Sequence, residues 1–252
     1  MLIFTNMNQT TKPRVDDHYK AITPNKYDYK FKLMCEVVAG RGTSFLDVAG
    51  GVGGAYFALK ENRQTPFSYT LVDFSEAAII KAAEFGIKGL RHNIDGSPLP
   101  IETASEDVVI LADVLEHLRN PWALLADATR VSKEYVYVTG PNFASLLCRL
   151  DLLRGHPIRQ MVVNKTGSLV DSRGRHTDHI HFLTYNNLIY WADKVGLEVV
   201  DQQCFIQRRL RPIRKILDRL MPNLAESYCI LFRKKPGFIM EKNPNLEYYD
   251  FL

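Results

Sequence analysis

The chain has 252 residues, of which 46% are hydrophobic, and this is enough to bury the core of one enzyme-sized domain. The formal net charge of +4 is too small to predict nucleic-acid binding by itself. The four cysteines are scattered without a CxxC pair, so neither a zinc ribbon nor a disulfide framework is indicated, and a reducing compartment is expected. No stretch approaches the roughly 18 consecutive apolar residues of a membrane-spanning helix.

The first informative segment is a glycine-rich turn in the sequence SFLDVAGGVGGA, which begins at Ser44. An apolar run ends in an acid, and a glycine cluster and helix-forming residues follow. Glycine allows the backbone to approach a ligand and to adopt positive φ, and a helix N-terminus offers unpaired N–H groups to a carboxylate or phosphate. The turn alone is also consistent with dinucleotide binding or with plain strand-to-helix packing.

A second β-rich run ends in Asp73. An acid about 20 residues beyond a glycine turn, at the tip of the next strand, typically accepts hydrogen bonds from ribose hydroxyls. A dinucleotide fingerprint would need glycine at position 56, where the chain has Tyr56, so NAD is disfavoured. The pattern acid-x-Gly-x-Gly-x-Gly fits instead from Asp47 to Gly53, with Ala49 in the first glycine position.

These motifs resemble those of the class I S-adenosylmethionine (SAM)-dependent methyltransferases. The form LDVAGGVG looks particularly similar to the ubiquinone/menaquinone-biosynthesis branch, and glycan-biosynthesis enzymes are a related comparison. The sequence DVVILADVLEHL, which begins at Asp107, resembles the fourth-strand motif of the same group. The resemblance covers roughly 43–142 and implies an α/β fold: a Rossmann-like, doubly wound sheet that is mostly parallel, with one antiparallel final strand and helices on both faces.

The other predicted elements alternate between strands and helices, as a parallel sheet with covered faces requires. Ser75, Asn120 and Thr184 are the expected N-caps of three helices. The expected helices lie at 55–60, 75–85, 121–130 and 184–194, and the expected strands at 44–48, 67–73, 87–90, 107–113, 135–140, 197–201 and 227–232.

We predict one class I methyltransferase domain over 1–252. Its expected parts are an N-terminal helical cover (1–42), the SAM-binding core (43–142), an acceptor-shaping insertion (143–184), and a closing helix and strand pair (185–252). Two amphipathic helices are expected: one follows an Asn142 cap and ends near Gly155, and one lies in a basic insert at about 206–222. The basic helix fits docking on the sheet, dimer contact, or an anionic membrane surface or lipid-like acceptor. The oligomeric state stays open.

The resemblance also implies how SAM would bind. The turn that contains Ala49, Gly51 and Gly53 would meet the amino-acid carboxylate, with Asp47 near the ammonium group, and Asp73 would accept from the ribose hydroxyls. The residues expected at the adenine are Phe74 and Ile94 beside the ring and Asp95 at the amino group. The alternatives are that Asp73 only caps a helix and that the Asp95-Gly pair is an ordinary turn.

Histidines mark the expected acceptor side. His179 and His181 would share one face of an extended segment, and His117 follows the fourth strand at the expected mouth of the crevice. We predict that at least one of the three is catalytic, as a general base for the acceptor. A polar loop whose histidines bond the backbone is the alternative. Asp171 and Asp178 are the nearby acids, but no second cluster completes a ligand set, so no metal site is predicted.

The predicted function is SAM-dependent methyl transfer to a small-molecule acceptor, such as a hydroxyl of a glycan precursor, a quinone-like compound or a lipid-linked compound. A nucleic-acid or protein methyltransferase and a non-catalytic SAM-binding protein are the alternatives. No nucleic-acid partner is expected, because the fourth strand ends in ADVL instead of an Asn/Asp-Pro-Pro-aromatic set, and no Pro-Cys nucleophile is present. The expected location is the cytoplasm, with peripheral contact at the inner membrane surface for a lipid-linked substrate.

Overall fold

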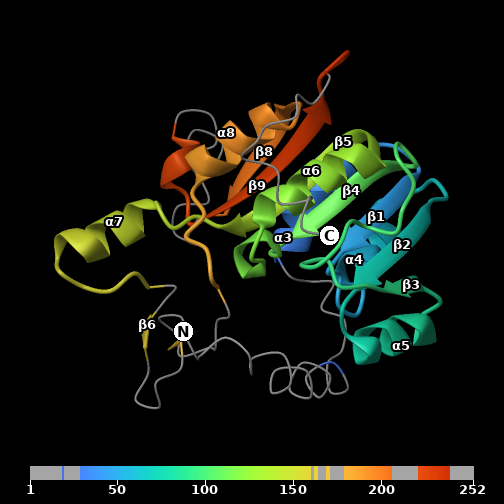
Figure 1. Cartoon of the computed structure of the whole chain (residues 1–252), viewed down its shortest axis with the longest axis horizontal. Coiled ribbons are helices and arrows are strands. Elements are labelled where there is room, and N and C mark those ends of the chain that lie inside the picture. Colours follow the sequence, from blue (N-terminus) through green and yellow to red (C-terminus); the bar gives the residue numbers. More distant parts are fainter. Residues whose placement is uncertain are drawn as a thin grey trace.

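A computed structural model describes residues 19, 29–159, 162–163, 169–170, 179–205 and 221–238. Its centre is a seven-stranded sheet with the order β3-β2-β1-β4-β5-β9-β8 (Figure 1). The strands are β1 (Ser44–Val48), β2 (Ser68–Asp73), β3 (Lys88–Arg91), β4 (Glu106–Ala112), β5 (Ser132–Pro141), β8 (Leu197–Phe205) and β9 (Ser227–Lys234). A separate antiparallel pair consists of β6 (Val162–Val163) and β7 (Leu169–Val170).

The direction of the strands confirms the predicted sheet. The five strands from β1 to β5 pair in parallel, whereas β9 runs antiparallel to both of its neighbours, β5 and β8. The register brings Val48 beside Val72 and Leu111, so β1, β2 and β4 end at the same level. We call this end of the sheet the carboxyl edge and the opposite end the amino edge.

Helices cover both faces of the sheet, as predicted. On β5, Tyr135 and Tyr137 belong to the core beneath the helices at 29–38, 54–62 and 76–84, while Val136 and Val138 belong to the core beneath the helices at 121–131 and 185–194. This alternation is the normal consequence of a strand that is buried on both sides. The helices are α3 (Tyr29–Val38), α4 (Gly54–Asn62), α5 (Glu76–Glu84), α6 (Pro121–Val131), α7 (Leu146–Leu153) and α8 (Tyr185–Lys194), with short 3₁₀ turns η1 (Leu115–His117) and η3 (Pro222–Leu224).

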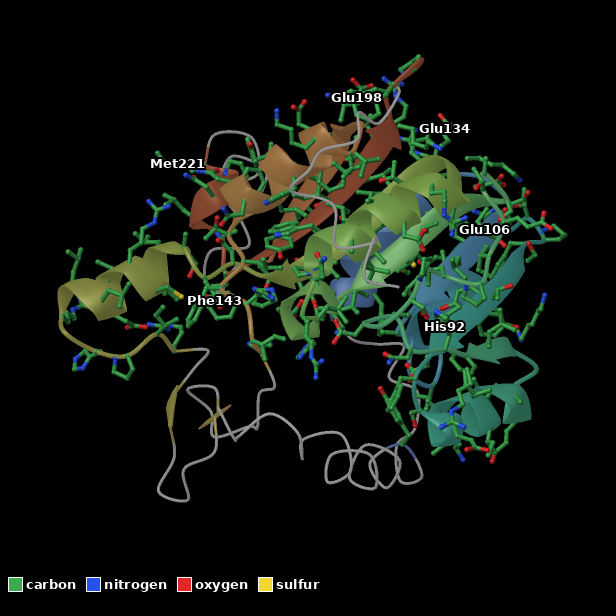
Figure 2. The ribbon with its side chains drawn as sticks, in the orientation of Figure 1. His92, Glu106, Glu134, Phe143, Glu198 and Met221 are labelled. Carbon is green, nitrogen blue, oxygen red and sulfur yellow. The ribbon has the colours of Figure 1, made fainter. Side chains whose placement is uncertain are left out.

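The two edges can be followed in Figure 2. Glu106 and Glu134, near the starts of β4 and β5, lie at one end of these strands, and Phe143, just after β5, lies at the other. The helix α7 projects away from the sheet beyond this second end (Figure 1). The carboxyl edge is where ligands bind in open α/β sheets, so the position of this edge decides where a site is sought.

The three predicted N-caps are confirmed. The side chains of Ser75, Asn120 and Thr184 each accept a hydrogen bond from the backbone N–H three residues later, at 3.2, 3.1 and 3.2 Å. Each bond satisfies one of the backbone donors that a helix start leaves without an intrahelical partner. Local sequence therefore determined where α5, α6 and α8 begin.

The predicted cap of α7 is wrong. Ser145, not Asn142, caps this helix. Asn142 is fully buried, and its amide donates to the carbonyls of Asn223 and Ala225, each at 2.9 Å. Asn142 therefore fastens the end of β5 to the segment before β9, which leaves the cap position to the next suitable hydroxyl. The predicted stop near Gly155 agrees with its φ of 72° just after the helix.

Most of the predicted basic insert, 206–220, lies outside the described residues. Within the part of the chain that the structure describes, no helix combines the length and apolar character needed to cross a membrane.

Candidate functional site

The turn between β1 and α4 has a left-handed backbone. The φ angles are 58° at Ala49, 56° at Gly51 and 86° at Gly53. Ala49 adopts the glycine-like conformation of its position in the motif, although this conformation costs an L-residue about 1–2 kcal/mol. Its N–H donates to the carbonyl of Val72 at 2.7 Å, so the strand register holds the turn in this shape.

Neighbouring side chains occupy the positions that a Cβ would take at two glycines of the turn. A Cβ at Gly50 would lie 2.4 Å from Asp47 Oδ2, and a Cβ at Gly53 would lie 2.4 Å from Ile87 Cδ1. No side chain fits at either position without displacing these neighbours. The turn is therefore closely packed on its protein side.

Asp73 is bonded to the turn. The residue is 5% exposed, its Oδ2 accepts from the N–H of Gly51 at 2.9 Å, and its Oδ1 accepts from the N–H of Ser75 at 2.8 Å. The second bond supports the start of α5, where Ser75 is the helix cap. The first bond brings the carboxylate against the glycine turn.

Asp47 is more deeply buried, with 2% exposure. The hydroxyl of Tyr69 donates to its Oδ2, while Oδ1 has no hydrogen-bond partner within the described residues. Burial raises the pKa of Asp47 to about 7, the Tyr69 hydrogen bond opposes this rise, the charge of Asp73 adds to it, and Lys30 opposes it. A cationic ligand beside Asp47 would stabilise its ionised form.

Tyr19, which was not among the predicted site residues, lies beside the same turn. A Cβ at Gly51 would be 3.0 Å from Cε1 of Tyr19. Burial, then the charges of Asp73 and Asp47, raise the pKa of the Tyr19 hydroxyl. The ring is thus close to both acids. Nothing in the residues around Tyr19 points to the turn, so only the fold reveals this proximity.

The predicted adenine residues lie on neighbouring segments. Phe74, directly after β2, is 43% exposed, and Ile94 is partly buried against the core. Asp95 Oδ1 accepts from the N–H of Arg119 at 2.7 Å, and the Arg119 guanidinium lies 3.6 Å from Oδ2. Asp95 therefore joins the loop after β3 to the segment after η1, which is a structural role in addition to any contact with adenine.

An ion pair lies at the end of β4. Asp113 has a φ of 52°, its N–H donates to the Thr139 carbonyl at 2.9 Å, and its Oδ2 lies 2.6 Å from Lys30 Nζ. Lys30 belongs to α3, which covers the same face of the sheet as the Asp47 side chain. Lys30 is thus paired with Asp113 and also acts on the charge of Asp47.

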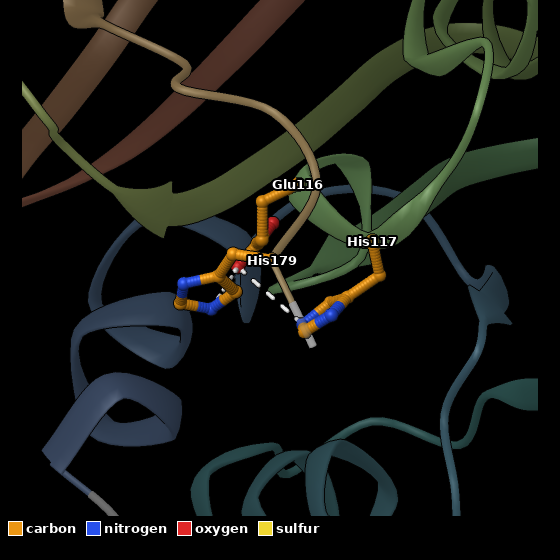
Figure 3. A group of neighbouring side chains, drawn as sticks. All are labelled: Glu116, His117 and His179. Atoms are coloured by element: carbon orange, nitrogen blue, oxygen red, sulfur yellow. Dashed lines mark ion pairs between the residues drawn. The ribbon is translucent and has the colours of Figure 1, made fainter. Parts of the chain in front are cut away.

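Glu116, His117 and His179 form a cluster just beyond β4 (Figure 3). The His117 and His179 rings are 4.9 Å apart between centroids. Their Nε2 atoms lie 3.9 and 4.0 Å from the same Glu116 oxygen, Oε1. Both histidines were predicted site residues, but their grouping with Glu116 was not predicted, because His179 is far from Glu116 and His117 in the chain.

Glu116 has an unusual environment for an acid. Its side chain is 1% exposed, and neither carboxylate oxygen has a hydrogen-bond partner within the described residues. Burial and the nearby charge of Asp113 raise the pKa of Glu116 to about 8, against the influence of its own backbone N–H and of Lys30. Burial therefore favours the protonated form of this carboxyl group, and a bound cation would favour its ionised form.

His181 lies apart from the cluster. Its Nε2 is 3.1 Å from the carbonyl oxygen of Arg119, which is the backbone contact that the alternative interpretation expected. The N–H groups of Ile180 and His181 donate to the Glu116 carbonyl at 2.9 and 3.2 Å. The segment 179–182 therefore lies along η1. Asp171 and Asp178, the acids considered beside the histidines, lie outside the described residues.

Comparison with protein-family models gives one match. The model described as methionine biosynthesis protein MetW matches residues 28–233. This range includes the glycine turn, Asp73, the Glu116 cluster and nearly all of β9. A search of curated proteins gives no significant match.

Solved structures with the same fold include several methyltransferases. A chain of the complex between the Haloferax volcanii Trm112 methyltransferase activator and a methyltransferase is 13% identical, with 90% of this chain and 97% of that chain covered and a TM-score of 0.58. A SAM-dependent methyltransferase from Mesorhizobium loti is 14% identical, with coverage of 83% and 100% and a TM-score of 0.58. The magnesium protoporphyrin IX methyltransferase of Synechocystis, solved with SAH, is 13% identical, with coverage of 91% and 88% and a TM-score of 0.54. The chain therefore has the class I methyltransferase fold.

Proposed function

Because the chain belongs to the family of the methionine biosynthesis protein MetW, we propose that it is a SAM-dependent methyltransferase with a small-molecule acceptor. The observation that carries this proposal is the 2.9 Å hydrogen bond from the Gly51 N–H to the Asp73 carboxylate. It joins the glycine turn to the acid of the next strand at the carboxyl edge, where a nucleoside-containing ligand would contact both. The narrower ubiquinone/menaquinone or glycan branch stays a prediction.

In this proposal the SAM amino-acid end lies at the turn of Ala49, Gly51 and Gly53, close to Asp47. A cationic ammonium group would stabilise the ionised Asp47 carboxylate, whose Oδ1 has no hydrogen-bond partner in the described structure. Asp73 would accept from the ribose hydroxyls. The residues proposed at the adenine are Phe74, Ile94 and Asp95.

The acceptor would lie on the side of β4, where the Glu116, His117 and His179 side chains gather. Methyl transfer is an in-line displacement, so the protein must align the acceptor with the sulfonium and, for a hydroxyl acceptor, assist loss of its proton. We propose that at least one of His117, His179 and His181 serves the acceptor and not SAM. A hydroxyl of a glycan precursor, quinone-like compound or lipid-linked compound suits this chemistry. A protein that only bound SAM would not need a buried ionisable cluster beside the ligand crevice, so the cluster favours catalysis.

Calorimetry with purified protein tests the proposal directly. SAM and its demethylated product, SAH, should bind at one site with a stoichiometry near one. Incubation with methyl-labelled SAM and fractions of a cell lysate should then transfer label to a small molecule. Absence of SAM binding by the parent protein would exclude the proposed function, whereas binding without transfer to any fraction would favour a SAM-binding protein without catalysis.

A further inference from the structure

The Glu116 carboxylate is buried without the hydrogen bonds that such a group normally has. Glu116 is 1% exposed, and both of its oxygens are without hydrogen-bond partners among the residues that the structure describes. Folded proteins rarely tolerate such a group and normally compensate it with hydrogen bonds, an ion pair or a bound ion. Two imidazole rings, those of His117 and His179, lie beside this carboxylate. Their distance from Glu116 shows whether they compensate it by hydrogen bonds.

The separations do not fit hydrogen bonds. The Nε2 atoms of His117 and His179 lie 3.9 and 4.0 Å from Glu116 Oε1, beyond the usual limit for an N–H···O bond. One donor atom from each of the three residues lies within 4.8 Å of the others. Donor atoms around a tetrahedral zinc ion, with ligand bonds of about 2.0–2.2 Å, lie about 3.3–3.5 Å apart. Side-chain shifts of about 1 Å would therefore bring all three atoms into a coordination sphere.

We propose that Glu116, His117 and His179 bind a divalent transition-metal ion through the carboxylate and the two imidazoles. Two histidines and one glutamate are a donor set that catalytic zinc sites use, and a further position then stays open for water or substrate. Imidazole ligands favour Zn²⁺ or Fe²⁺ over Mg²⁺ or Ca²⁺. The His117 side chain is 38% exposed, so an ion and a further ligand can reach the cluster from solvent.

Contacts around the cluster hold its ligands in place. Glu116 and His117 are adjacent in η1, and the backbone bonds from Ile180 and His181 to the Glu116 carbonyl keep His179 beside them. Phe143 packs edge-on against the His179 ring, with 5.6 Å between centroids. A site whose ligands are fixed by surrounding contacts needs little rearrangement when the ion binds.

The role of the ion rests on the proposed function, although its binding does not. At the end of β4 the open position would take the oxygen of a hydroxyl acceptor and lower the pKa of that hydroxyl. The proton would pass to water, and an oxygen lone pair would form the new bond to the methyl carbon. The electron pair of the breaking S–CH₃ bond would return to sulfur, so SAM becomes SAH.

Titration of untagged, chelator-treated protein with Zn²⁺ tests the site, with Mg²⁺ as a comparison. We expect one Zn²⁺ per chain, much weaker Mg²⁺ binding, and visible absorption bands when Co²⁺ replaces Zn²⁺. E116Q, H117A and H179A should each weaken Zn²⁺ binding by roughly a hundredfold or more. H156A is the matched control, because His156 is exposed on the segment after α7 and should leave Zn²⁺ binding unchanged.

E116Q is nearly isosteric, so it keeps the test informative if an alanine variant misfolds, and circular dichroism verifies the fold of each protein. Zn²⁺ affinity in E116Q and H179A equal to that of the parent would overturn the proposal, as would absence of stoichiometric Zn²⁺ binding by the parent. SAM calorimetry on the same proteins separates the two proposals. Loss of Zn²⁺ with SAM binding retained supports the metal site, whereas Zn²⁺ binding without SAM binding would contradict only the proposed function.

Discussion

Asp107 at the amino edge of the sheet is held in the opposite way to Asp47 and Glu116 at the carboxyl edge. At the amino edge, Asp107 accepts from the N–H groups of Thr43 and Ser44 at 2.6 and 3.1 Å and pairs with Lys133 at 2.9 Å. At the carboxyl edge, Glu116 has no hydrogen bond to either oxygen within the described residues, and Asp47 has none to Oδ1. Yet Asp47 and Glu116 are more deeply buried than Asp107.

We propose that this difference separates an acid that supports the fold, Asp107, from two acids that a ligand would compensate, Asp47 and Glu116. Partial burial opposes ionisation of Asp107, but the Thr43 N–H, Lys133 and the Ser44 N–H hold its pKa well below the ordinary value. Burial instead raises the pKa of Asp47 to about 7 and that of Glu116 to about 8. Perturbed acids in a crevice are typical of functional sites, whereas a satisfied acid at the other edge stabilises the fold. Five variants test this contrast between the two edges.

The largest effect is expected at Asp73. D73A should weaken SAM binding by about 2–4 kcal/mol, because two ribose hydroxyls would lose a charged acceptor in a partly buried crevice. D107A, at the opposite edge, should leave SAM affinity close to that of the parent. Calorimetry of both variants checks this difference. If D73A bound SAM as tightly as the parent, the ribose role of Asp73 would be wrong.

At Asp107 the expected effect is on stability. D107A leaves the Thr43 and Ser44 N–H groups without their acceptor, and water compensates partly because the site is half open, so we expect a loss of about 1–2 kcal/mol near neutral pH. A folded-state pKa below the unfolded value stabilises the protein above about pH 4, and this contribution disappears as the pH falls further. Urea unfolding near pH 7 and near pH 3 should therefore show a difference between parent and D107A that shrinks in acid. An unchanged difference would contradict the ionic role.

Asp47 should show the opposite pH dependence. Its folded-state pKa is raised to about 7, so the folded state keeps a proton that the unfolded state releases above about pH 4. In the absence of SAM, this acid therefore lowers stability as the pH rises from about 4 to about 7, by about 1–2 kcal/mol after relaxation of the site. D47N should remove this part of the pH dependence. Unfolding curves of D47N and the parent that stay parallel across this range would contradict a raised pKa.

The sequence predicted those features that depend on neighbours along the chain. The N-caps at Ser75, Asn120 and Thr184 were predictable because each hydroxyl or amide bonds an N–H three residues later. The cap of α7 was not, because Asn142 and Ser145 are both good caps and only a tertiary contact selects between them. Likewise, only the folded structure brings His179 close to Glu116. The positions of these residues along the sequence therefore could not predict that they form one cluster.

The smallest effect concerns the glycine turn. Gly51 and Gly86 both have positive φ, 56° and 75°, so alanine at either position should cost about 1 kcal/mol of stability. A Cβ at Gly86 meets nothing within 4 Å, whereas a Cβ at Gly51 would lie 3.0 Å from Tyr19. The turn at Gly51 is also where the amino-acid end of SAM is expected. G51A and G86A should therefore unfold at similar urea concentrations, while only G51A loses SAM affinity, by roughly tenfold or more. Equal SAM affinity in the two variants would show that the turn serves packing alone, and the ligand would then have to be sought elsewhere along the carboxyl edge.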